Sequence, residues 1–199
     1  MSESAPPSRL SVTFPAYAAK LTDAIASIRL EALDLLAADL QAAWQTGHQV
    51  FICGNGGSAA NALHLANDFL YGVGISGKSG LRVHALPANT AITTCLGNDV
   101  GYDRIFADQL RVLANAGDVL IVLSGSGNSP NILVALEQAK ALGVRSHAIV
   151  GFDGGEARVR ADNAIHVSVH DMQIAEDTQM LVGHALMQLL RDDTIGDAT

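Results

Sequence analysis

Two short segments carry residues that could bind a phosphate. Gly54-Asn55-Gly56-Gly57-Ser58 follows an apolar run at 50–53, and Ser124-Gly125-Ser126-Gly127-Asn128-Ser129 follows an apolar run at 119–123. Each segment precedes an amphipathic helical pattern, which predicts two loops that connect a strand to a helix. Backbone N–H groups at a helix N-terminus, supported by serine hydroxyls, form a site for phosphate. Two such loops in one sheet predict a ligand with a phosphate and a polar body.

The first loop also fits a looser dinucleotide-binding fingerprint, with Gly54, Gly56 and Ala59 at its three small positions. That fingerprint expects an acidic residue at the end of the next strand, where it holds the ribose. The next expected strand ends Ala85-Leu86-Pro87, without a carboxylate. A nicotinamide site would also make no use of the second, serine-rich loop, so the dinucleotide interpretation is disfavoured.

Two imidazoles and two carboxylates form a second group of candidate residues. His64 and Asp68 are four residues apart on the helix expected after the first loop, so they share a face. Glu176 and His184 are eight residues apart on the last expected helix, which leaves about 80° between them. Such a set suits a divalent metal, with zinc as the first choice. The spacing alone fits better with a capped or half-buried histidine whose partner is the aspartate four residues away.

Size, charge and cysteine usage limit the class of protein. The 199 residues are 49% hydrophobic and only 5% aromatic, which predicts one α/β domain with an aliphatic core. The net charge of -8 argues against direct nucleic-acid binding. The two cysteines, Cys53 and Cys95, lie in apolar stretches and are expected to be buried and to stay reduced. With no leader-like pattern and no apolar run near the roughly 20 residues of a membrane span, we expect a cytoplasmic protein.

The alternation of strand and helix patterns predicts a three-layer α/β/α doubly wound sheet of five parallel strands. The strands are expected at 48–53, 81–86, 118–123, 146–150 and 164–169. The helices of this sheet are expected at 58–71, 90–96, 102–114, 130–142, 154–161 and 174–191. Ligands bind such sheets at the carboxyl ends of the strands near a topological switch point, and both candidate loops lie on that edge.

The remaining segments have simpler patterns. Apolar residues recur at helical spacing over 17–45 and cover much of the circumference, which predicts one long helix that is partly buried against another subunit. The glycine-rich stretch 72–80 is a candidate mobile loop. We therefore expect a disordered N-terminus (1–9), an N-terminal oligomerisation helix (10–46), the sheet domain (47–192) and a polar tail (193–199).

The order of these motifs resembles the sugar isomerase (SIS) domain family, more narrowly its phosphoheptose isomerase branch, over about residues 17–192. The resemblance is carried by both loops with His64 and Asp68, by Gly97-Asn98-Asp99, by Gly151-Phe152-Asp153-Gly154-Gly155 and by the segment 176–184. It implies a homotetramer with active sites at subunit interfaces. The implied reaction is a ketose–aldose isomerisation of sedoheptulose 7-phosphate to D-glycero-D-manno-heptose 7-phosphate through an enediol(ate). The product would serve heptose biosynthesis for lipopolysaccharide or capsule.

The resemblance also implies a role for each matching position. Asp68 takes the place of the catalytic base, and His184 that of the catalytic acid. The implied zinc ligands are His64, Asp68, Glu176 and His184. The implied substrate-binding residues, whose serine hydroxyls hold the phosphate, are Asn55, Gly56, Gly57, Ser58, Asn98, Asp99, Ser124, Gly125, Ser126 and Ser129.

Four positions depart from the family pattern. Asp68 replaces a glutamate and reaches about 1.5 Å less; Glu176 replaces a glutamine, Gly72 an arginine and Gly125 a threonine. An isomerase of a different sugar phosphate is therefore one alternative. The other is a non-catalytic SIS scaffold that resembles the DnaA initiator-associating proteins and binds DnaA. The retained pair of histidines beside acids favours the enzyme.

Overall fold

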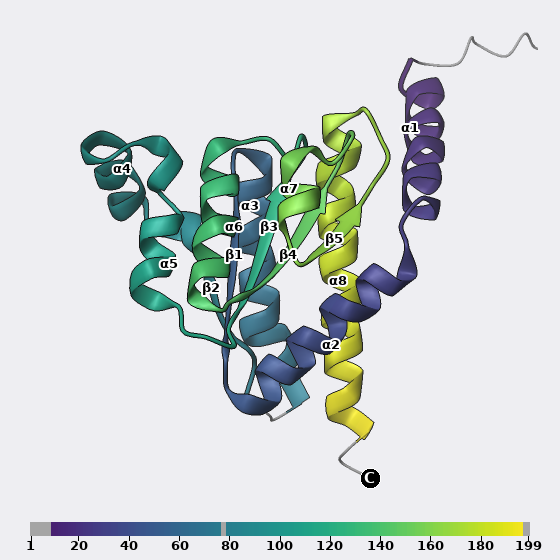
Figure 1. The fold of residues 1–199 in the computed structure, drawn as a ribbon. Coiled ribbons are helices and arrows are strands. Elements are labelled where there is room, and N and C mark those ends of the chain that lie inside the picture. Colours follow the sequence, from purple (N-terminus) through teal and green to yellow (C-terminus); the bar gives the residue numbers. More distant parts are fainter. Residues whose placement is uncertain (1–8, 77–78, 197–199) are drawn as a thin grey trace, which may run out of the picture.

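The computed structural model describes residues 9–76 and 79–196, and five of their segments form one parallel sheet (Figure 1). The strands are β1 (Gln49–Gly54), β2 (Arg82–Ala85), β3 (Val119–Ser124), β4 (Arg145–Val150) and β5 (Asn163–His166). They lie in the order β2-β1-β3-β4-β5, and all neighbours pair in parallel. The predicted sheet is confirmed, and its switch point lies between β1 and β3.

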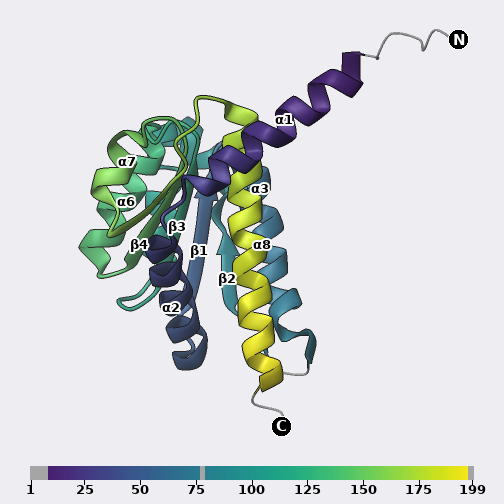
Figure 2. The same ribbon diagram turned by 90° about the vertical axis from the view of Figure 1, so that its right-hand side faces the viewer.

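Helices cover both faces of this sheet, as predicted (Figures 1 and 2). One face packs against α2 (Leu30–Thr46), α3 (Gly57–Asn67) and α8 (Met172–Gly196), the other against α5 (Ala107–Leu113), α6 (Pro130–Leu142) and α7 (Gly155–Arg160). Successive side chains of a strand point to opposite faces. Val50 and Ile52 therefore join the first core and Phe51 the second. Burial on both faces explains the continuous apolar run of β1.

The N-terminal region forms two helices, α1 (Arg9–Ala26) and α2, where one long helix was predicted. The backbone N–H and the Oγ of Ser27 both donate to the carbonyl oxygen of Ala24, at 3.1 and 2.6 Å, which closes the end of α1. Arg29 is then extended, so the second helix starts in a new direction. Residues 1–8, within the predicted disordered N-terminus, lie outside the described residues.

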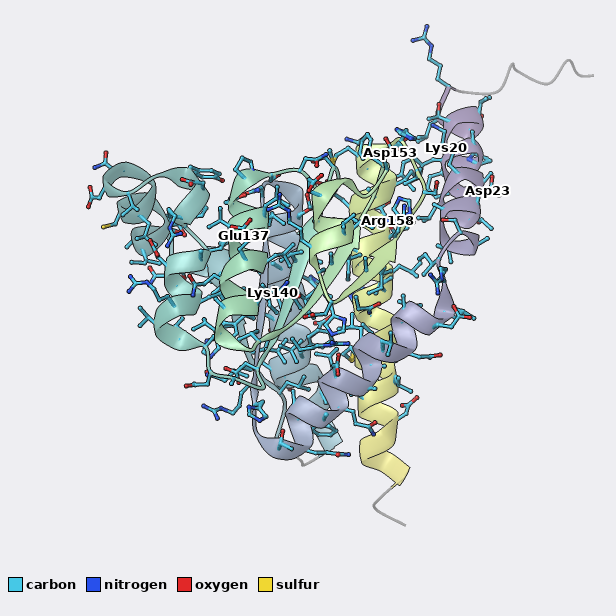
Figure 3. All side chains as sticks on the ribbon, viewed as in Figure 1. Lys20, Asp23, Glu137, Lys140, Asp153 and Arg158 are labelled. Carbon is cyan, nitrogen blue, oxygen red and sulfur yellow. The ribbon has the colours of Figure 1, made fainter. Side chains whose placement is uncertain are left out.

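Helix α1 leaves the body of the domain beyond the start of α8 (Figure 2). Lys20, labelled on this helix in Figure 3, places its Nζ 3.2 Å from Asp171 Oδ2. The Tyr17 hydroxyl donates to Asp177 Oδ2 at 2.6 Å, and this hydrogen bond raises the pKa of Tyr17 to about 12. Beyond these contacts, Leu10 and Phe14 of α1 are exposed, so this helix presents apolar side chains to solvent.

Helix α4 (Thr90–Asp99) contains no buried residue and lies at the outer end of the molecule (Figure 1). The prediction that Cys95 is buried is therefore wrong, whereas Cys53 of β1 is buried as predicted. The helix predicted at 102–114 is divided into a 3-10 turn (Tyr102–Arg104) and α5. Across residues 9–76 and 79–196, the structure contains no helix with the length and apolar content that a bilayer crossing requires.

The glycine-rich segment 72–80 follows a π-helical turn (Asp68–Gly72) and starts with a 3-10 turn (Val73–Ser76). Residues 77–78 of the candidate mobile loop lie outside the described residues. Trp44 Nε1 donates to the Ser79 carbonyl oxygen at 2.8 Å. Because Trp44 is close to the end of α2 and Ser79 lies three residues before β2, this part of the segment lies at the amino edge of the sheet, opposite the two candidate loops.

A buried polar network attaches α2 to the sheet. His147 of β4 is fully buried; its Nε2 lies 2.8 Å from Asp39 Oδ2, and its Nδ1 lies 3.0 Å from Asn163 Nδ2. A neutral imidazole satisfies both contacts, with Nε2–H donating and Nδ1 accepting. Burial lowers the pKa of His147, although Asp39 and Asp162 oppose this shift; Arg145 adds to it.

This network predicts a loss of stability in mild acid. The unfolded chain takes up the His147 proton near pH 6.5 and the folded chain at a lower pH, so folding stability falls as pH drops below about 6.5. We expect the midpoint of thermal unfolding to decrease between pH 7 and 5. A His147→Gln variant should be less stable at pH 7 and should show a shallower decrease. Parallel pH profiles for the two proteins would contradict this assignment.

Candidate functional site

The two candidate loops meet at the carboxyl edge of the sheet, at its switch point. Gly54 at the end of β1 is in register with Leu123 of β3, so the chain enters both loops side by side. A cavity of about 270 Å³ lies between the loops. Its lining includes eight of the ten predicted substrate-binding residues, namely Asn55, Gly56, Gly57, Ser58, Ser124, Gly125, Ser126 and Ser129.

This cavity is rich in hydrogen-bond donors. The N–H groups of Gly57 and Ser58 belong to the first turn of α3, where no helical partner exists for them. The Oγ of Ser124 accepts from the Gly127 N–H at 3.0 Å, and the Oγ of Ser126 accepts from the Asn128 N–H at 3.3 Å. Since these oxygens already accept, their hydroxyl hydrogens can be donated to a ligand. The arrangement suits an anion such as phosphate.

The N-terminus of α7 holds the serine-rich loop in place. The Ala157 N–H donates to the Gly127 carbonyl oxygen at 2.9 Å, and the Glu156 N–H donates to Asn128 Oδ1 at 3.0 Å. Gly127 has a φ of +69°, and a Cβ there would lie 1.9 Å from the Gly154 carbonyl oxygen. Only glycine allows this close approach of two backbones.

Gly127→Ala is therefore expected to lower the free energy of unfolding by about 2–4 kcal/mol, since it combines a left-handed φ with a backbone clash. Gly47→Ala is the matched control, because Gly47 has a φ of +74° but open space where a Cβ would be. It should cost about 1 kcal/mol. Urea unfolding measures both, and equal losses would show that the contact between loop and α7 contributes nothing.

Asn98 and Asp99, the other two predicted substrate-binding residues, are not part of the cavity lining. They lie at the end of α4, where Asn98 Nδ2 donates to Asp99 Oδ1 at 2.7 Å. This hydrogen bond, with a second from Cys95, lowers the pKa of Asp99. Within one chain, the structure does not bring these two residues to the cavity.

One stripe of α3 faces α8, and the two helices lie side by side (Figure 2). Gly57, His64 and Asp68 share this stripe, because residues seven and eleven positions apart return to nearly the same face of a helix. At its upper end, the Glu176 carboxylate lies over Gly57, where a Cβ would come within 2.4 Å of it. Asn61 continues the stripe and donates from Nδ2 to the Glu176 carbonyl oxygen at 2.9 Å.

His64, Asp68 and His184 converge further along the same stripe. The two Nε2 atoms of the imidazoles lie 3.1 Å apart. Asp68 Oδ2 lies 3.4 Å from His64 Nε2 and 3.3 Å from His184 Nε2. The Asp68 side chain is only 16% exposed, whereas the imidazoles are about half exposed, at 54% and 45%. Asp68 also begins the π-helical turn, a feature that often marks functional sites.

These three residues fit a divalent metal. Zinc binds imidazole nitrogen and carboxylate oxygen at about 2.0–2.2 Å in a tetrahedral arrangement, which places neighbouring ligand atoms about 3.3–3.5 Å apart. The three separations above are close to this spacing. The Glu176 carboxylate is not part of this group of three, and its role as a further ligand stays a prediction.

A larger hollow of about 470 Å³ lies between the start of α2 and β5. Two arginines line it, Arg29 and Arg158, the second of which is labelled in Figure 3. Two acids, Glu31 and Asp162, accompany them, and none of the predicted site residues is present. This hollow therefore contains no residue of the two candidate loops and none of His64, Asp68 and His184.

Sequence reasoning missed Met172, which lines the loop cavity. Its Sδ would lie 2.4 Å from a Cβ at Gly125, so the thioether occupies the space that a side chain at 125 would need. The contact joins segments far apart in the sequence, and no local pattern could have indicated it. Asn131 and Tyr102, which hydrogen-bond to Asn55, were also missed. A polar residue directly after Pro130, in an otherwise apolar helical start, was the available signal for Asn131.

Comparison with known families gives one match over most of the chain. Residues 13–151 match the family described as "SIS domain". The phosphoheptose isomerase of Burkholderia pseudomallei (strain 1710b) is 39% identical over 150 residues, which cover 75% of this chain and 76% of that protein. The phosphoheptose isomerase of Clostridium acetobutylicum is 36% identical over 155 residues, which cover 78% and 79% of the two proteins.

Solved structures agree with these relatives. Phosphoheptose isomerase GmhA from Neisseria gonorrhoeae superposes with a TM-score of 0.84 at 29% identity, over 92% of this chain and 97% of that one. A phosphoheptose isomerase from Francisella tularensis gives a TM-score of 0.85 at 26% identity, over 94% of this chain and all of that one. The likeness therefore extends over nearly the whole fold.

Proposed function

This chain belongs to the SIS domain family, and within it to the phosphoheptose isomerases, and we propose that it interconverts sedoheptulose 7-phosphate and D-glycero-D-manno-heptose 7-phosphate. The observation that carries the proposal is the placement of Asp68 between two imidazoles on the α3 stripe that starts at the loop cavity. An anion site and a proton-transfer site are thus aligned along one helix.

The distance between these two sites supports a long-chain sugar phosphate. Gly57 and His64 are seven residues apart, which corresponds to about 10 Å along α3 at 1.5 Å per residue. Side chains on a helix lean toward its N-terminus, which shortens this gap. An extended chain advances about 1.2 Å per bond, so the seven bonds from phosphorus to C2 of a 7-phosphate span roughly 8–9 Å. The three corresponding bonds of a triose phosphate span only about 4 Å.

We assign proton transfer at the reacting carbons to Asp68 and His184. The Asp68 carboxylate removes a proton from C1 of the ketose while the carbonyl oxygen at C2 takes a proton from an imidazole N–H of His184, which gives the enediol. When Nε2 of His184 holds a metal, this donor is its Nδ1–H. Asp68 then returns its proton to C2, and the O1 hydroxyl gives its proton to His184 as C1 becomes the aldehyde carbonyl. A carboxylate and an imidazole within hydrogen-bond reach of each other are suited to such general acid–base steps.

We assign a zinc ion to His64, Asp68 and His184, with Glu176 as the candidate fourth ligand. A bound zinc polarises a carbonyl oxygen and stabilises negative charge that develops on it. The phosphate loops lie away from His64, Asp68 and His184, so binding energy from the phosphate can hold C1 and C2 in place during the reaction. Glu176 itself lines the loop cavity, beside Gly57.

A homotetramer is part of the proposal, because the isolated chain leaves apolar and functional surface uncovered. Helix α4 has no buried residue yet carries Asn98 and Asp99. Leu10 and Phe14 are exposed on α1, and Leu70 is exposed beyond α3. Sites completed by a neighbouring copy would bring α4 to a loop cavity. Light scattering in solution tests this assembly, and the expected mass is four times that of one chain.

The reaction is tested with a panel of C5 to C7 sugar phosphates, each with and without a chelator. Sedoheptulose 7-phosphate should turn over fastest, its unphosphorylated form should turn over poorly, and the chelator should suppress turnover. If another sugar phosphate turns over fastest, the protein is still a sugar-phosphate isomerase, but its substrate is that other sugar. If no sugar turns over and the protein captures DnaA, the protein is a non-catalytic scaffold and not an isomerase.

A further inference from the structure

A reciprocal pair of amides joins the two phosphate loops across the switch point. Asn55, in the loop after β1, donates from Nδ2 to Asn131 Oδ1 at 2.9 Å. Asn131, in the first turn of α6, donates from Nδ2 to Asn55 Oδ1 at 2.8 Å. If one of the two amides were rotated by 180°, its nitrogen would face the other nitrogen and its oxygen the other oxygen. Each amide therefore fixes the orientation of the other. Asn131 is only 1% exposed.

Tyr102 adds a third segment to this pair. Its hydroxyl donates to Asn55 Oδ1 at 3.1 Å from the 3-10 turn that follows α4. The Asn55 oxygen, which has two lone pairs, therefore accepts twice. Among the residues that the structure describes, one N–H of the Asn55 side chain is left without a partner, and Asn55 lines the loop cavity.

We propose that Asn131 is a positioning residue for substrate binding, which holds the two phosphate loops together and restricts Asn55 to donating one hydrogen bond into the cavity. This inference rests on the proposed sugar-phosphate site. Asn131 itself is buried behind the loops and acts through Asn55. Tyr102 links the same contact to the segment that carries Asn98 and Asp99.

The removal of Asn131 should therefore weaken ligand binding more than it changes the chemical step. In Asn131→Ala, both the Oδ1 and the Nδ2 of Asn55 lose a partner, and the side chain can turn its acceptor toward the cavity. In Asn131→Asp, one oxygen still accepts from Asn55 Nδ2 while the other faces Asn55 Oδ1 and repels it. The aspartate variant should resemble the alanine variant, although it has nearly the same volume as asparagine.

Asn163→Ala is the matched control. Asn163 is also buried, at 9% exposure, and its Nδ2 contacts the Ala32 carbonyl oxygen and His147 Nδ1, away from the loop cavity. Tyr102→Phe is a second test variant, because Tyr102 is 61% exposed and the loss of its hydroxyl should leave folding intact.

The experiment measures kcat and KM for sedoheptulose 7-phosphate and, separately, the Kd for inorganic phosphate. Asn131→Ala and Asn131→Asp should raise both KM and phosphate Kd about tenfold, the equivalent of about 1.4 kcal/mol, and should lower kcat less than threefold. Tyr102→Phe should raise KM about threefold. Asn163→Ala should lower the unfolding midpoint while its KM and phosphate Kd stay within twofold of wild type.

If the Asn131 variants fold, KM and phosphate Kd within twofold of wild type would overturn the positioning role. If the Asn131 variants fail to fold, an unchanged KM in Tyr102→Phe would overturn it. The phosphate measurement separates this inference from the proposed reaction. If wild type binds phosphate but turns over no sugar, a tenfold loss of phosphate affinity in Asn131→Ala would support the loop contact while the isomerase function fails.

Discussion

Asp68→Asn is expected to lower kcat for sedoheptulose 7-phosphate by about 10³-fold, within the range that a general base contributes. The amide keeps the shape of the carboxylate but cannot take a proton from carbon. KM should change less than about threefold, since the phosphate loops lie at the other end of the stripe. Steady-state kinetics measure both constants, and such a loss in kcat alone identifies a group that acts in the transition state.

Asp68→Glu is the control for this substitution, because it restores the longer acid of the family pattern at the same position. It should keep turnover within about tenfold of wild type. The zinc content of each variant must be measured alongside, because Asp68 is also a candidate ligand. Wild-type kcat in a zinc-loaded Asp68→Asn protein would remove this carboxylate from the proton transfer.

His64→Ala and His184→Ala are each expected to lower zinc affinity by more than about a hundredfold, since even the loss of an outer-shell partner costs 10- to 100-fold. The pair lies with its Nε2 atoms 3.1 Å apart beside Asp68, so either substitution removes one of the three converging ligand atoms. Zinc per chain, measured by atomic emission after dialysis, should fall to near zero from the single ion proposed for wild type. Turnover should fall with it.

His48→Ala provides the matched control, because His48 Nδ1 also lies 3.3 Å from a carboxylate, that of Asp118, but without a second imidazole. It should leave zinc content and turnover unchanged. Full zinc occupancy in both His64→Ala and His184→Ala would show that the metal, if bound, is held elsewhere.

Local patterns could predict the phosphate loops and two of the three converging residues His64, Asp68 and His184. Strands buried on both faces produce continuous apolar runs, and β1 and β3 were found on this basis together with the loops that follow them. The i, i+4 spacing placed His64 beside Asp68. The approach of His184, however, depends on how α8 packs against α3, and the sequence positions are 120 apart.

The rest required tertiary contacts that no local signal carries. The break between α1 and α2 contains no proline or glycine; it is made by hydrogen bonds of Ser27 that a helical pattern does not exclude. Asn98 and Asp99 were expected at the cavity because of their family position, but within one chain they do not line it. Pairwise contacts such as Asn55 with Asn131 also become visible only when the loops are placed side by side.

Helix α4 has no buried side chain of its own. Within one chain it is held by Leu96, which packs partly buried against the core, and by the Asn89 side chain, which caps its N-terminus. Isolated helices shorter than about 12–15 residues are marginal in water, so these ten residues have little support within one chain. If neighbouring copies cover it, its amides should be protected from deuterium exchange at high protein concentration and exchange quickly after dilution. Specific activity should decline over the same dilution range. The protein concentration would then determine what fraction of the chains is in the assembled, active form.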